Sequence, residues 1–150
     1  MESWLTLITK TNSYAMLAAP PRNLIDAFKS VYPGQSPDIF VRAPGRVNLL
    51  GGHVDTHGGP VINIAINREI WLAAAYGSVD LVQLSAADLA ESTMFSLRNV
   101  DDHKNIAGDP LPRWAMYPAG MAWALLRRGL KVNGINAAIL GNVPMCAGLS

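Results

Sequence analysis

The chain has 150 residues, of which 50% are hydrophobic and 15% charged, and this length is typical of one domain with a sizeable core. Such a composition excludes intrinsic disorder, which requires low hydrophobicity and a high net charge. Twelve basic and eleven acidic residues leave a net charge of +1, so no overall electrostatic field attracts nucleic acid or an anionic membrane.

The beginning of the chain shows no clear periodicity. We expect residues 1–18 to form an irregular leader before a domain over residues 19–150. Small residues at the end of the leader resemble a signal-peptide cleavage site, but Glu2 and Lys10 contradict the charge and hydrophobic patterns of a signal peptide. No apolar run reaches the roughly 18 residues of a membrane span. A single cysteine, Cys146, excludes an internal disulfide framework, and we expect a cytoplasmic protein.

Strand patterns recur along the domain. The predicted strands cover residues 38–43, 61–67, 69–76, 81–85, 93–97 and 135–140. In the second of them, isoleucines at every other position predict a half-buried strand. Gly77 and Ser78 predict a turn.

Two segments have helical patterns. An amphipathic helix follows Pro20–Pro21 and ends at Pro33–Gly34. Residues 114–130 are apolar on nearly every side, which predicts an interior helix whose regular part begins near Pro118. We expect Trp71, Trp114 and Trp123 to be core residues. Strands that come first and then mix with helices are typical of the α+β class.

Polar side chains are densest over residues 42–59, where Arg46 precedes His53, Asp55 and His57. Glycine pairs on both sides of the last three predict a loop. Three interpretations are open. His-x-Asp-x-His suits zinc or iron, although no distant Cys/His cluster completes the ligand set. An exposed glycine-rich turn is the ordinary alternative. A sugar or polyol site suits the chemistry better, because Asp accepts two hydroxyl hydrogen bonds and Arg stabilises developing negative charge.

A second segment covers residues 141–150 and follows a predicted strand. Its small residues and Ser150 are typical of a phosphate-cradling turn. It is not a Walker A loop, because no Gly-Lys-Ser/Thr follows. Taken alone, the default interpretation is a plain turn at a strand end.

Together, the two segments carry a specific resemblance. Pro44–Asp55 has the sequence Pro-Gly-Arg-Val-Asn-Leu-Leu-Gly-Gly-His-Val-Asp, and Pro144–Ser150 has Pro-Met-Cys-Ala-Gly-Leu-Ser. Both resemble motifs of the GHMP kinase superfamily, and the first resembles the galactokinase motif within it. The resemblance covers about residues 21–150. It implies a two-domain α+β kinase, with this chain as the N-terminal domain up to the phosphate loop.

The resemblance implies transfer of the ATP γ-phosphate to the anomeric hydroxyl of galactose or a related sugar. Arg46 would lie beside the reacting hydroxyl, where its charge acts most strongly in the transition state. Gly52, His53 and Asp55 would complete the sugar site. The ATP phosphates would be held by Pro144, Ala147, Gly148, Leu149 and Ser150. Mg²⁺ would arrive with ATP, and no metal site of the protein's own, no nucleic acid and no membrane is implied.

The sequence departs from the galactokinase motif at four points. Gly52 replaces a glutamate and Thr56 a tyrosine, so arabinose, a uronic acid or an amino sugar stays open as the substrate. Cys146 replaces a glycine of the phosphate loop, and we interpret it as a small packed residue. The chain ends at Ser150, before the family's next helix, its catalytic aspartate and its C-terminal domain.

We therefore expect a sugar-1-kinase represented by its N-terminal part, which does not catalyse alone. Two alternatives stay open. Gly52 and Cys146 also suit a non-catalytic relative that binds sugar or nucleotide as a sensor. A truncated gene product without a stable fold is the other alternative, because strands without partners expose their edges.

Overall fold

A computed structural model describes residues 19–51 and 57–144, and the predicted leader lies outside these ranges. Within them, five strands form one mixed sheet in the order β1-β2-β5-β3-β4. The elements in chain order are α2 (Arg22–Val31), β1 (Ile39–Leu50), β2 (Ile62–Tyr76), β3 (Leu81–Ala86), β4 (Glu91–Ser96), the 3₁₀ helices η3 (Val100–Asp102) and η4 (Arg113–Ala115), α3 (Met116–Arg127) and β5 (Ile135–Gly141). One mixed sheet with few helices confirms the predicted α+β class.

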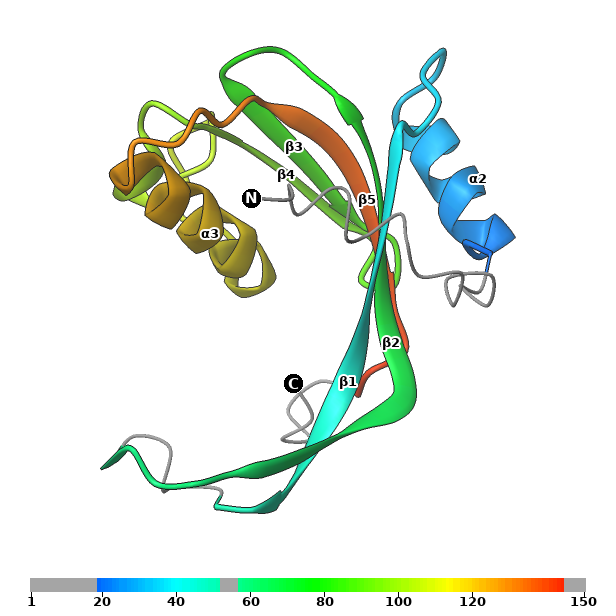
Figure 1. Cartoon of the computed structure of the whole chain (residues 1–150). Coiled ribbons are helices and arrows are strands. Elements are labelled where there is room, and N and C mark those ends of the chain that lie inside the picture. Colours follow the sequence, from blue (N-terminus) through cyan, green and yellow to red (C-terminus); the bar gives the residue numbers. More distant parts are fainter. Residues whose placement is uncertain (1–18, 52–56, 145–150) are drawn as a thin grey trace, which may run out of the picture.

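Helices α2 and α3 cover opposite faces of the sheet (Figure 1). The amphipathic pattern of α2 is confirmed, because Leu24 and Phe28 are one helical turn apart and both are fully buried against β2 and β5. On the other face, Leu84 and Phe95 form a core with the buried side of α3. Each such side chain stabilises the fold by about 1.5–3 kcal/mol on burial. The sheet thus separates two small cores.

Strand β5 lies between β2 and β3, antiparallel to the first and parallel to the second. The predicted turn at Gly77–Ser78 therefore does not join two paired strands. Ala137 and Ala138 of β5 are fully buried in the centre of the sheet, one in each core. β5 is the last strand in the described chain and pairs with β2, which in turn pairs with β1. The residues that directly follow β5 therefore start beside β2.

Strands β1 and β2 continue beyond the other three strands as a curved two-stranded arm (Figure 1). The two strands predicted over residues 61–67 and 69–76 are one continuous strand, because β1 extends to Leu50 and pairs with β2 along its length. The prediction of a half-buried strand is wrong for its first part. Ile62 and Ile64 are 52% and 49% exposed, since no described element packs on the arm.

Helix α3 begins two residues before Pro118, whose missing N–H costs nothing in the first turn. The predicted interior helix is wrong. Ala119 and Ala122 are buried against the sheet, whereas Tyr117 and Met121 are 76% and 62% exposed. One side of α3 faces the sheet and no described element covers the other side. Among the described helices, none is long and apolar enough to cross a membrane.

The three tryptophans predicted as core residues have different environments. Trp71 is buried in the core beneath α2. Trp114 is half-buried against the other core, and its indole N–H donates to Glu91 Oε2 at 2.6 Å. For Trp123 the prediction is wrong, because it lies on the exposed part of α3, where the Arg127 guanidinium lies 5.3 Å from its ring centroid.

Candidate functional site

The first motif begins on a strand. Arg42, Arg46 and Asn48 lie on β1 at even spacing, and Arg46 pairs with Ala65 of β2. Because side chains alternate along a strand with a period of two, Arg46 and Asn48 project from the same face of β1. The strand ends at Leu50, so the loop predicted from the glycine pairs begins only after Arg46 and Asn48.

Two irregularities in the pairing of β1 and β2 enclose Arg46. Between Pro44 and Arg46, the partner on β2 changes from Glu69 to Ala65, so β2 has two extra residues there. Between Asn48 and Leu50, β1 has one extra residue. Such bulges increase the local twist and change the direction of nearby side chains. Arg46 therefore lies on a short regular stretch bounded by two changes of register.

Gly51 directly follows β1 and is the first residue of the predicted loop. Its φ is +85°, and a Cβ at this position would lie 2.6 Å from the carbonyl oxygen of Pro60. Both the positive φ and the close approach require glycine. His57 and Gly58 lie in a turn at the other end of the connection, which confirms the loop for these two residues.

Glu69 connects β1 and β2 at the base of the arm. Its carboxylate accepts hydrogen bonds from Arg42 Nε and, at 2.6 Å, from the indole N–H of Trp71. The Arg42 guanidinium also lies 5.8 Å from the centroid of the Trp71 ring, within cation–π range. The Trp71 hydrogen bond, followed by that from Arg42, holds the pKa of Glu69 below its ordinary value. Trp71 lies two residues from Glu69 on the same strand, but Arg42 meets them only through the register of β1 and β2, so no local pattern predicts the whole cluster.

Asn142, two residues before the second motif, contacts the same glutamate. The N–H of Asn142 donates to the carbonyl oxygen of Glu69 at 3.0 Å, and the N–H of Glu69 donates to Asn142 Oδ1 at 2.7 Å. On its other side, Glu69 pairs with Pro44. Pro44 on β1, Glu69 on β2 and Asn142, directly after β5, thus form one row. Since neighbouring strands are about 4.8 Å apart, Pro44, the first residue of the first motif, lies roughly 10 Å from Asn142, two residues before the second motif.

A hollow of about 230 Å³ lies beside this row on the α2 side of the sheet. Its lining residues are Pro21, Asn23, Glu69, Trp71, Leu140, Gly141 and Asn142. It combines a carboxylate, two carboxamides and an indole edge. Its volume is smaller than the roughly 300 Å³ at which small-molecule sites begin.

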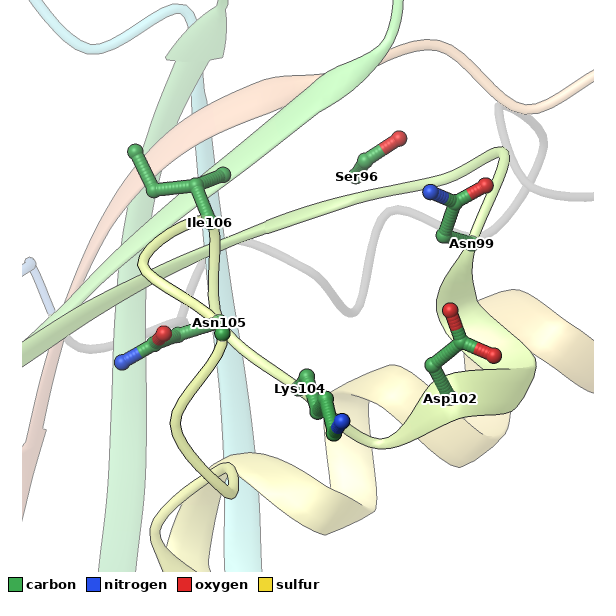
Figure 2. A pocket seen from close by; sticks show the side chains of 7 residues that line it. Ser96, Asn99, Asp102, Lys104, Asn105 and Ile106 are labelled. Carbon is green, nitrogen blue, oxygen red and sulfur yellow. The ribbon is translucent and has the colours of Figure 1, made fainter.

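A larger hollow of about 320 Å³ lies after β4 (Figure 2). The side chains of Ser96, Asn99, Asp102, Lys104, Asn105 and Ile106 line it together with Gly108. Two of its polar groups serve local structure: Asn105 Oδ1 accepts the N–H groups of Ala107 and Asp109, and Ser96 Oγ donates to Asp80. No residue of either motif lines it, so we place the candidate site at the row and not here.

The structure places two of the predicted site residues. Arg46 lies on β1 and Pro144 lies three residues after the end of β5, and both are exposed. The predicted residues outside the described ranges are Gly52, His53, Asp55, Ala147, Gly148, Leu149 and Ser150, together with the variant positions Thr56 and Cys146. Within the described ranges, no group of three or more His, Cys, Asp or Glu residues is arranged to hold a metal ion.

The Glu69 cluster predicts a dependence of stability on pH. A carboxyl group whose pKa is lower in the folded state stabilises the fold above its ordinary pKa, and this stabilisation is lost as the pH falls through the folded-state value. We expect the unfolding midpoint of the wild-type protein to fall more steeply than that of Glu69→Gln between about pH 5.5 and pH 3. Thermal unfolding at a series of pH values measures both slopes. Parallel curves would contradict the role of Glu69.

Comparison with known proteins shows that the chain is similar to galactokinases. Residues 26–76 match the family model described as the galactokinase galactose-binding signature, a range that contains β1, β2 and Arg46. The galactokinase of Roseiflexus sp. (strain RS-1) is 37% identical over 127 residues, and that of Limosilactobacillus fermentum is 33% identical over 130 residues. This chain is galactokinase-like.

Solved structures agree with the sequence relatives. The galactokinase-like chain superimposes on Lactococcus lactis galactokinase complexed with galactose with a TM-score of 0.70 and 27% identity, over 86% of this chain and 32% of that one. Methanococcus jannaschii mevalonate kinase shares the fold, with a TM-score of 0.56, 20% identity and coverage of 78% and 36%. The resemblance to GHMP kinases is thereby confirmed. The matches with the two galactokinase sequences cover 85% and 86% of this chain but 30% and 32% of the relatives, so the chain spans about a third of their length.

Proposed function

We propose that the galactokinase-like chain supplies the sugar site and part of the nucleotide site of an ATP-dependent kinase, which phosphorylates the anomeric hydroxyl of galactose or a related sugar. The match of residues 26–76 to the galactose-binding signature carries this proposal, because the range includes Arg46 and Asp55. The row of Pro44, Glu69 and Asn142 supports it, since phosphoryl transfer requires donor and acceptor to be held next to each other.

Arg46 is the residue that we assign to catalysis. Phosphoryl transfer redistributes negative charge over the oxygens of the transferring group, and a fixed cation stabilises that charge without reorganisation. Arg42 is unsuitable for this role because Glu69 already pairs with it. Arg46 forms no ion pair with any residue of the described ranges.

The remaining roles follow the motifs. Gly52, His53 and Asp55 complete the sugar site in this proposal. The ATP phosphates are held by Pro144, Ala147, Gly148, Leu149 and Ser150, and Mg²⁺ arrives with ATP as part of the substrate. Residues 19–150 form the N-terminal kinase domain after a leader over residues 1–18. A single cysteine and the use of ATP favour a cytoplasmic location.

Asp55→Ala tests the sugar site. A carboxylate that accepts two sugar hydroxyls contributes to binding in both the ground state and the transition state, so its loss raises KM for the sugar. We expect an increase of about tenfold or more, with KM for ATP unchanged, in steady-state assays that vary each substrate separately. Asp26→Ala, which removes an exposed carboxylate from α2, is the matched control. An unchanged sugar KM in Asp55→Ala would refute the assignment.

The proposed function is tested on the protein encoded by the complete reading frame that contains this chain. We would assay it with ATP and Mg²⁺ against galactose, arabinose, glucuronate and N-acetylgalactosamine, and identify the phosphorylated carbon by NMR. Phosphorylation of one sugar at its anomeric hydroxyl is the expected result, and the preferred sugar would reveal what Gly52 and Thr56 select. A folded protein that phosphorylates none of the four would refute the proposal and favour the sensor alternative.

A further inference from the structure

Asn142, the first residue after β5, has a side-chain contact that the motif assignments leave unused. We propose that Asn142 is a positioning residue for the nucleotide: its side-chain carbonyl fixes the direction in which the chain leaves the sheet toward Pro144. This inference rests on the proposed kinase function and names a residue on which its nucleotide affinity depends.

The hydrogen bonds at this point replace the last step of the sheet ladder. Gly141 pairs with Ile70, so Asn142 and Glu69 are the next pair in the antiparallel register. A regular pair would exchange two main-chain hydrogen bonds. Here the N–H of Asn142 donates to the Glu69 carbonyl oxygen, as in a ladder, but the N–H of Glu69 donates to Asn142 Oδ1 at 2.7 Å. The side chain has taken the place of the main-chain carbonyl.

This substitution lets the chain turn away without leaving a donor unpaired. If the main-chain carbonyl of Asn142 bonded to Glu69, the strand would have to continue in the plane of the sheet. Because Oδ1 accepts instead, the main chain after Asn142 is free to leave the ladder. Val143 precedes Pro144 and is therefore restricted to extended conformations, which transmits the direction set at Asn142.

Glu69, the residue that binds Asn142, makes two side-chain hydrogen bonds of its own. The carboxylate of Glu69 bonds to Arg42 on β1 and to Trp71, which is buried beneath α2. The main chain of Glu69 is thus fixed by its own side chain as well as by pairing with Pro44. Asn142 joins the second motif to a rigid point of the sheet, and not to another exposed loop.

A fixed starting direction matters for phosphate binding. Main-chain N–H groups hold a triphosphate well only when they are oriented before the ligand arrives, because ordering them on binding costs affinity. Loss of the Asn142 acceptor leaves the N–H of Glu69 unpaired and removes one of the two bonds that orient residues 142–144. We therefore expect weaker nucleotide binding with little change in sugar binding.

Calorimetric titration with the magnesium complex of a non-hydrolysable ATP analogue tests this on the protein of the complete reading frame. We expect Asn142→Ala to raise Kd about fivefold, the scale of one lost hydrogen bond. Asn142→Asp keeps an acceptor oxygen and should retain most of the affinity. Asn136→Ala is the matched control, because Asn136 lies at the other end of β5 and its side chain also makes a hydrogen bond, to Gln35 at 2.8 Å.

Steady-state assays with the best sugar provide the second measurement. We expect Asn142→Ala to raise KM for ATP and to leave KM for the sugar unchanged. An unchanged nucleotide Kd in Asn142→Ala would overturn the inference, and so would an equal loss in Asn136→Ala, which would indicate a general effect on stability. A wild-type protein that binds no nucleotide would refute the proposed function itself, a result distinct from either of these.

Discussion

Gly134→Ala is expected to destabilise the fold by about 3 kcal/mol or more. Gly134 is buried just before β5, where its N–H donates to Val79 and its carbonyl accepts from Gly77. A Cβ built on Gly134 would lie 2.0 Å from the carbonyl oxygen of Ser78 and 2.1 Å from that of Leu81. Both are main-chain atoms, so no side chain can move aside to relieve the overlap. The connection between β2 and β3 would have to shift, and so would the start of β5.

Gly120→Ala is the matched control for this substitution. Gly120 is exposed in α3, and a Cβ there has no neighbour within 4 Å. Alanine at an exposed helical position stabilises by up to about 1 kcal/mol relative to glycine. Urea unfolding followed by tryptophan fluorescence measures both changes. If Gly134→Ala unfolded at the same urea concentration as the wild-type protein, the close main-chain packing around Gly134 would be refuted.

Arg46→Ala is expected to lower kcat by about a hundredfold or more, with a much smaller change in KM for the sugar. This pattern identifies an interaction that is stronger in the transition state than in the bound substrate. It follows from the proposed place of Arg46 beside the transferring phosphoryl group. Initial rates at saturating ATP, with the sugar varied, separate the two parameters.

Two further variants make this result specific. Arg46→Lys keeps the charge but loses the planar fork of the guanidinium, so we expect it to recover only part of kcat. Arg98→Ala removes an exposed arginine that pairs with Asp80 at the far side of the sheet, and it should leave both parameters unchanged. A wild-type kcat in Arg46→Ala would remove Arg46 from catalysis.

Local patterns were enough to predict most of the elements. Helix α2 follows its proline pair and ends before Pro33–Gly34, because helix boundaries depend on a few neighbouring residues. Strand patterns placed β3, β4 and β5 to within two residues. The boundary between the two strands predicted over residues 61–76 was wrong, because the continuity of β2 depends on its pairing with β1.

Exposure could not be predicted in the same way. The isoleucines of the arm and the outward side of α3 have the composition of buried elements, yet Ile62 and Tyr117 are exposed. An apolar pattern states only that a side chain favours burial. Whether it is buried depends on which other element lies over it, and in the described ranges none covers either surface.

Local patterns were sufficient to predict the fold class and to place Arg46 in a galactokinase-like motif, because such patterns are carried by residues close together in the chain. The phosphate loop after β5 stays a prediction from the same kind of pattern. The position of β5 between β2 and β3, and the contacts of Glu69 with Arg42 and Asn142, depend on how distant segments pair and could not be read from local patterns. These contacts join residues up to 73 positions apart. Their physical cause is the register of strand pairing, which depends on the balance of interactions over the whole sheet and on no single segment.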